Sequence, residues 1–119
     1  MAEARESVGK AEQLLAEDRP KDAVEALGPA LVYLLGEESI RARLTLARAY
    51  MKMPKMLGRA DAVLTEAIRD SPRNPDLHVA MGRLLAMRNE RPAAMVAFKK
   101  ALEIAPDHAD ARAEVEAAG

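Results

Sequence analysis

Histidine is the side chain best suited to acid–base or metal chemistry near neutral pH, and this chain has two, His78 and His108. His108 lies between Asp107 and Asp110, a set of nitrogen and oxygen ligands that could hold a cation. The same residues also suit the start of a helix, because an aspartate that follows Pro106 can cap the first turn. We interpret the set as a helix start and predict that it holds no metal.

Three methionines, Met51, Met53 and Met56, have a spacing at which thioethers could bind copper(I). Methionine also fills gaps in cores and lines adaptable protein-binding surfaces. We favour a packing or binding role and predict no cofactor, while a copper site stays open as the alternative.

Nucleophilic catalysis has no recognisable set of residues in this sequence. The chain has no cysteine, and its serines, Ser7, Ser39 and Ser71, lie outside any Gly-x-Ser-x-Gly motif. Its six glycines are scattered singly, so the sequence lacks a glycine-rich loop for phosphate. We therefore predict no catalytic residues and a protein that is not an enzyme.

The charge balance limits the class of partner. Eighteen basic side chains are balanced by nineteen acidic ones, and the aromatic residues are Tyr33, Tyr50 and Phe98. A nucleic-acid-binding domain usually has a basic excess and more aromatic side chains. The longest strongly apolar run, residues 31–35, is far shorter than the ~20 residues that span a bilayer, and the N-terminus does not resemble a secretory signal. We predict no nucleic-acid binding, no membrane insertion and a cytoplasmic protein.

The sequence predicts helices as the elements that hold any functional side chains in place. Strong helix formers are abundant, and no segment alternates apolar and polar residues as a half-buried strand does. Apolar residues recur at helical spacing in seven places, which predicts an all-α fold whose short connections make successive helices antiparallel. The seven stripes run over residues 4–15, 23–34, 40–51, 60–68, 77–85, 94–105 and about 107–117.

Several residues mark the expected helix ends. Asn74 is a good N-cap before Pro75, and Asn89 suits the left-handed residue that often follows a helix. Pro20 and Pro92 suit first turns, where the missing N–H costs little.

Two prolines interrupt the stripes. Gly28-Pro29 lies inside the second stripe, and it predicts a kinked helix or a break near Leu27. Met53-Pro54 ends the third helix, and it leaves residues 55–58 as a loop or an irregular start to the fourth.

The sequence also repeats itself. A small–large–small pattern recurs in three stripes, and Pro72 and Pro106 lie 34 residues apart. A helix–turn–helix unit of this period is typical of repeat proteins. The pattern consists of Ala23, Leu27 and Ala30, then Ala60, Leu64 and Ala67, then Ala94, Phe98 and Ala101.

These residues resemble the tetratricopeptide repeat. Met81-Gly82 stands where the family has Leu-Gly, and Leu85 where it has Tyr, while Ala94 and Phe98 occupy further signature positions. The resemblance implies an α-solenoid of three antiparallel helix–turn–helix repeats with a C-terminal capping helix, in a single domain. The expected repeats cover residues of about 4–37, 40–74 and 75–108, and the capping helix covers about 107–117.

In this family the first helix of each repeat lines a concave groove that binds a peptide. The resemblance therefore implies a set of candidate ligand contacts on three helices. The first repeat contributes Arg5, Val8, Glu12, Leu15 and Ala16, the second Arg41, Leu44, Arg48, Met51 and Lys52, and the third Asp76, Val79, Arg83, Ala86 and Met87.

Arginine among apolar residues suggests what this groove would bind. Arg48 and Arg83 could pair with carboxylates, while Met and Leu accept apolar side chains of varied shape. We expect an acidic, partly apolar peptide segment of another protein; the alternative is that both arginines are ordinary solvated residues.

Two specialised functions compete with a general adaptor. Family members that bind an acidic chaperone tail carry a carboxylate clamp, but this chain has Val8, Glu12, Asp76 and Ala80 at clamp positions, so we do not expect that activity. A self-associating scaffold, using its convex face or an open first repeat, remains the alternative function.

Overall fold

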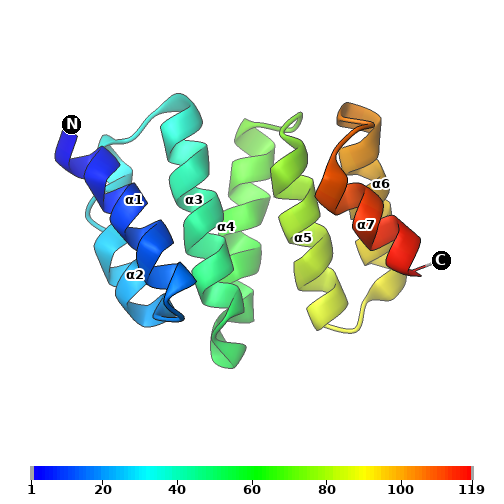
Figure 1. The fold of residues 1–119 in the computed structure, drawn as a ribbon, viewed down its shortest axis with the longest axis horizontal. Helices are drawn as coiled ribbons and strands as arrows, with labels where there is room; N and C mark the ends of the chain where they lie inside the picture. The colour runs from blue at the N-terminus through cyan, green and yellow to red at the C-terminus, as the bar shows by residue number, and fades with distance from the viewer. Residues whose placement is uncertain (1, 119) are drawn as a thin grey trace. The chain divides into compact units, whose positions relative to one another are not determined.

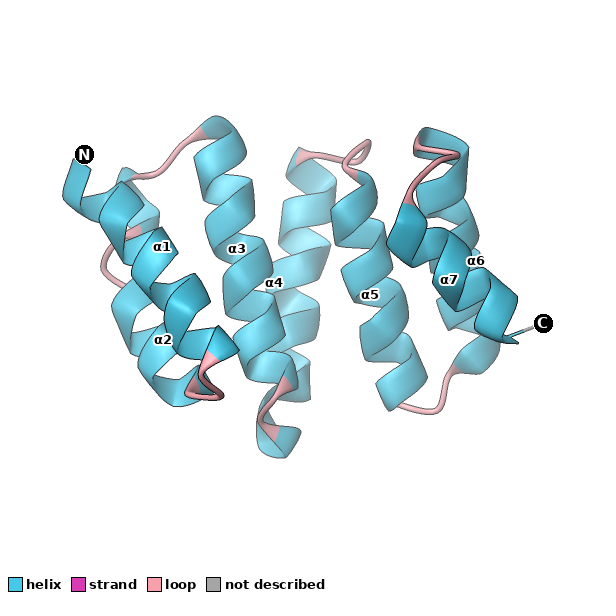
Figure 2. Ribbon diagram, in the orientation of Figure 1, coloured by secondary structure: helices cyan, strands magenta, loops and turns pink. Residues whose placement is uncertain are grey.

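The computed structural model describes residues 2–118, and these are helical with no strand (Figures 1 and 2). The predicted all-α fold is confirmed. The described part contains seven α-helices and two short 3₁₀-helices. Their bounds are α1 Ala2–Ala16, α2 Pro20–Leu27, η1 Leu31–Tyr33, α3 Gly36–Met51, η2 Pro54–Met56, α4 Leu57–Asp70, α5 Pro75–Met87, α6 Arg91–Ile104 and α7 Ala109–Ala118.

The chain forms two compact units, Met1–Val63 and Leu64–Gly119. In the first unit α1 packs against α2 and α3, and α2 also packs against α3. Their small and apolar residues form one buried cluster, because the stripes of all three helices turn inward. The cluster consists of Ala4, Val8, Ala11, Leu14, Ala23, Leu27, Ala30, Leu34, Ala42, Leu46 and Ala49.

The second stripe breaks after Leu27 instead of bending. Gly28 continues the helical conformation for one residue, and its N–H bonds to the Val24 carbonyl, but Pro29 has no N–H with which to extend the ladder. The chain then forms a turn and the single turn η1, and Gly36 at φ +60° leads into α3. Of the two predicted outcomes, kink or break, the structure has the break.

In the second unit α5 and α6 form an antiparallel hairpin, and α7 packs against α6 (Figure 1). A Cβ atom added to Gly82 would lie 2.5 Å from Cε1 of Phe98, so the ring rests directly on the glycine backbone. The small residue allows the two helices to approach, and the large one fills the space between them. The buried cluster here consists of Val79, Ala94, Phe98, Ala101 and Ala111.

The predicted helix ends are mostly confirmed. The Asn74 side chain accepts from the N–H groups of Asp76 at 3.0 Å and Leu77 at 3.4 Å, as an N-cap does. Asn89 has φ +66°, and the Glu90 N–H closes the α5 end on the Leu85 carbonyl at 2.9 Å.

Pro20 and Pro92 lie in the first turns of α2 and α6, as predicted. After Pro54, the single turn η2 precedes α4, which begins at Leu57, so residues 55–58 are an irregular start to the fourth helix and not a loop.

The prediction that Asp107 caps the last helix is wrong by one residue. Helix α7 begins at Ala109, and Nδ1 of His108 accepts the N–H of Ala111 at 3.2 Å. The carbonyl of His108 accepts the first helical bond, from Arg112, at 3.0 Å. Histidine is thus the cap, because its ring nitrogen reaches the free N–H that Asp107 is one residue too early to meet.

Candidate protein-binding faces

Four of the predicted contacts lie on α3, and the fifth, Lys52, is the residue that ends it; at helical spacing they share one face. Arg41, Arg48 and Lys52 are exposed and Met51 is half-buried, whereas Leu44 is only 8% exposed. A partner on this face would therefore meet three cations and a thioether, with little access to Leu44.

Arg41 is already engaged within the first unit. Its Nε donates to Oε2 of Glu12 on α1 at 2.7 Å, and its Nη2 donates to the other carboxylate oxygen. The hydrogen bond to Glu12, and then the negative charge of the same carboxylate, raise the pKa of Arg41 above its usual value. Both ends of this two-point pair come from predicted groove residues, so they neutralise one another instead of waiting for a ligand.

A second ion pair joins the same two helices. Nε of Arg5 on α1 lies 3.1 Å from Oε1 of Glu38 on α3. Two of the predicted contacts of α1, Arg5 and Glu12, are thus already paired with charged residues of α3.

Arg48 differs from Arg41. It is exposed and has no ion-pair or hydrogen-bond partner among the described residues. It lies in the last turn of α3, one turn from Lys52, where the helix dipole favours positive charge. Arg48 and Lys52 are therefore the cations of α3 that remain available.

On α5 the predicted contacts meet the capping helix. Val79 is buried in one cluster with Ala111 of α7, and Ala86 packs at the edge of that cluster. Nε of Arg83 donates to Oε2 of Glu114 on α7 at 2.7 Å. Of the five α5 residues predicted to contact a ligand, two are exposed, Asp76 and Met87, and Met87 is the apolar one, at 53%.

Asp76, the remaining predicted contact on α5, also binds α7. Its Oδ1 lies 2.6 Å from Nε2 of His108. Since Nδ1 of His108 accepts a backbone N–H, we assign the ring proton to Nε2, which donates to Asp76. One side chain thereby caps α7 and ties its start to the start of α5.

The ion pairs between α5 and α7 were not predicted from the sequence. A signal was available, because Asp110 and Glu114 lie four residues apart and present two carboxylates on one face of the capping helix. Arg83 lies between them, at 2.7 Å from Glu114 and 3.9 Å from Asp110.

The described residues contain no group of three His, Cys, Asp or Glu side chains placed to hold a metal. Within the same part of the chain, no helix combines the length and apolar character needed to cross a membrane.

A comparison with known protein families identifies the family of this chain. The family model for the tetratricopeptide repeat matches residues 54–114, which is about half of the chain. The chain belongs to the tetratricopeptide repeat family. No curated protein matched the chain in sequence.

The matched span of this tetratricopeptide repeat protein contains the Gly82–Phe98 contact that brings α5 and α6 together. The predicted family resemblance is thus confirmed there, whereas the first repeat, residues 4–37, lies outside the span and stays a prediction. Tetratricopeptide repeat domains generally mediate protein–protein interactions and are typically non-enzymatic.

Proposed function

We propose that this protein is a non-enzymatic adaptor that binds an acidic, partly apolar peptide segment of a partner protein on the exposed face of α3. The observation that carries the proposal is Arg48, an exposed arginine without a partner in the described residues. A guanidinium binds a carboxylate with two parallel hydrogen bonds, which gives both affinity and orientation.

The neighbours of Arg48 define the rest of the partner. Lys52 adds a second cation one turn away, and half-buried Met51 offers an adaptable apolar contact between them. A segment with a carboxylate beside an aliphatic or aromatic side chain would satisfy all three residues. Arg41 and Leu44, the other two predicted contacts of α3, contribute less, because Arg41 is paired with Glu12 and Leu44 is 8% exposed.

The α5 residues form a second, conditional part of the proposal. Val79, Arg83 and Ala86 pack against or pair with α7, so a partner reaches them only when that helix leaves. While α7 stays in place, Met87 is the apolar α5 residue of the set that is exposed.

The test compares two charge reversals of equal size. Arg48→Glu changes the proposed contact, while Arg73→Glu makes the same change at an exposed arginine in the turn after α4, outside the proposed contacts. Partners are first captured from native lysate on the wild-type protein and identified by mass spectrometry. Titration calorimetry then measures the binding of the identified segment to all three proteins.

We expect Arg48→Glu to weaken binding about tenfold or more, because reversal replaces an attraction with a repulsion, and Arg73→Glu to leave it unchanged. The difference should shrink at high salt, since both groups are exposed. Equal affinity for the two variants would show that the α3 face is not the binding surface.

A further inference from the structure

The break in the second stripe exposes an apolar segment in the first unit. Residues 31–35 form one 3₁₀ turn and two extended residues after Pro29, so only part of the segment can face the core. Leu34 is buried, but Val32, Tyr33 and Leu35 are 79%, 61% and 84% exposed. Neighbouring exposed apolar side chains of this size commonly mark interaction surfaces.

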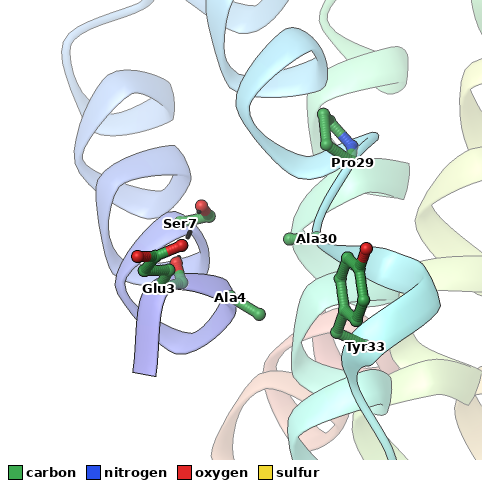
Figure 3. A pocket seen from close by; sticks show the side chains of 6 residues that line it. All are labelled: Glu3, Ala4, Ser7, Pro29, Ala30 and Tyr33. Carbon is green, nitrogen blue, oxygen red and sulfur yellow. Dashed lines mark hydrogen bonds between the residues drawn. The ribbon is translucent and has the colours of Figure 1, made fainter. Parts of the chain in front are cut away.

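A pocket of about 330 Å³ opens on one side of Tyr33. Pro29, Ala30 and Tyr33 line one side of it, and Ala4 and Ser7 of α1 line the other (Figure 3). Glu3 also lies on the α1 side, on the first turn of that helix. The pocket therefore has a mixed lining, with apolar surface from the alanines, Pro29 and Tyr33 and polar groups from Glu3 and Ser7.

Glu3 and Tyr33 together favour a cation. The Glu3 carboxylate has no partner among the described residues, because the hydroxyl of Ser7 donates to the Glu3 backbone carbonyl, at 3.0 Å, and not to its side chain. The exposed face of a tyrosine ring also attracts a guanidinium. An arginine would lay its aliphatic stem along Ala4, Ala30 and Pro29 and place its charge between the ring and the carboxylate.

A second pocket, of about 190 Å³, lies on the other side of Tyr33. It is lined by Tyr33, Leu34 and Leu35 together with Arg5 and Glu38, which are paired with each other at 3.1 Å. Because that pair is neutral as a whole, the second pocket favours an apolar side chain and not a charge.

We propose that the two pockets around Tyr33 bind a short cationic segment of a partner protein, with an arginine beside Glu3 and an aliphatic side chain against Leu35. The two pockets share Tyr33 in their linings, so alternate residues of an extended chain, whose side chains point the same way about 7 Å apart, would place one side chain on each side of the ring. The surface differs from the α3 face of the proposed adaptor function in both position and charge preference, and it does not depend on that function.

A symmetric pair of copies is a poorer occupant than a cationic segment. A two-fold interface brings each residue of the patch near the same patch on the other copy. Glu3, and the exposed Glu37 that follows the apolar segment, would then meet carboxylates without a compensating cation, since Arg5 is occupied by Glu38.

The test uses a matched peptide pair and nuclear magnetic resonance. One short acetylated and amidated peptide carries arginine and leucine at alternate positions; the other replaces arginine with citrulline, which has the same shape without the charge. Each is titrated into ¹⁵N-labelled protein. We expect the arginine peptide to shift the amide signals of Glu3, Ala4, Ala30 and Tyr33, and the citrulline peptide to bind about fivefold more weakly.

Protein variants test which residues bind the arginine side chain of the peptide. Glu3→Gln and Tyr33→Leu should each weaken the arginine peptide severalfold, whereas Tyr33→Phe, which keeps the ring, should not. Glu6→Gln is the matched control, because Glu6 is an exposed carboxylate on the same helix that lines neither pocket.

Three outcomes would overturn the proposal. The first is equal affinity for the arginine and citrulline peptides. The second is a set of shifted signals that maps away from the two pockets. The third is broadening of the Glu3 and Tyr33 signals that grows with protein concentration in the absence of peptide, which would make a second copy the occupant.

Discussion

The hairpins α1–α2 and α5–α6 turn in the same way. At the end of α1, Asp18 has φ +60° and the Arg19 N–H bonds to the Leu14 carbonyl at 2.8 Å; at the end of α5, Asn89 has φ +66° and Glu90 closes the helix in the same manner. A proline then lies in the first turn of the following helix in both hairpins. The local turn chemistry of the two hairpins is therefore equivalent.

The packing of the two hairpins differs. At corresponding repeat positions the first has Ala11 and Leu27, and the second has Gly82 and Phe98. Helix α2 ends after 8 residues, whereas α6 has 14. The second hairpin is also covered by α7, which packs against α6 and pairs with α5, while the first is followed by the apolar segment at residues 31–35.

The two units differ in how many of the predicted contact residues are already paired within the unit. In the α5–α6–α7 unit, Arg83, Asp76 and Val79 all have partners within the unit. The first unit leaves an apolar segment, Glu3 and Arg48 available. Both proposed binding surfaces, the α3 face and the pockets around Tyr33, therefore lie in the first unit, whereas the contacts of α7 stabilise the second.

The largest predicted effect breaks the packing of the second hairpin. In Gly82→Ala the new methyl group would lie within 3 Å of three ring atoms of Phe98, so the ring or the helix must move. We expect a loss of about 3 kcal/mol in the free energy of unfolding, measured by urea denaturation. A loss below about 0.5 kcal/mol would show that α5 and α6 separate easily.

A double substitution tests whether the residue pair of the first hairpin can replace the pair of the second. Gly82→Ala combined with Phe98→Leu gives the second hairpin the alanine–leucine pair of the first. Leucine lacks the ring that meets the new methyl group, so we expect the double variant to be more stable than Gly82→Ala alone. Additive losses would mean that the residues at these positions do not compensate one another.

The next largest effect concerns helix α7, which packs on the second hairpin. His108→Ala removes the side-chain cap of α7 and its hydrogen bond to Asp76. We expect a loss of about 1.5 kcal/mol and faster amide hydrogen exchange over residues 109–118. His108→Asn is the control, because asparagine also caps helices, and it should retain most of the exchange protection. Unchanged exchange in His108→Ala would show that α7 is held by its apolar contacts alone.

The sequence predicted features that depend on neighbouring residues. Asn74, Asn89 and Pro20 act locally through capping, the left-handed conformation and a missing N–H, so their effects could be read from residue type and spacing. Gly82 and Phe98 were also recognised as signature positions of the family, but their contact with each other came from the structure.

Features that depend on contacts between distant segments escaped prediction. Arg41 and Arg83 were both expected to await a ligand, but Glu12 lies 29 residues before Arg41 and Glu114 lies 31 residues after Arg83. Nothing local to either arginine identifies its partner. His108 was similarly set aside in favour of Asp107, because a one-residue difference in where α7 begins changes which side chain can reach the free N–H.

The smallest predicted effect tests the feature that the two hairpins share. A non-glycine residue at positive φ brings its Cβ close to a backbone oxygen, and aspartate tolerates this less well than glycine. We expect Asp18→Gly to stabilise the protein by about 0.5 kcal/mol, seen as a rise of about 2 °C in Tm, because the relief of strain slightly exceeds the added freedom of the unfolded chain. Lys10→Gly, an exposed change inside α1, should instead cost about 1 kcal/mol. If both variants lose stability equally, then Asp18 carries no conformational strain, and the equivalence of the two turns would lie in their hydrogen bonds alone.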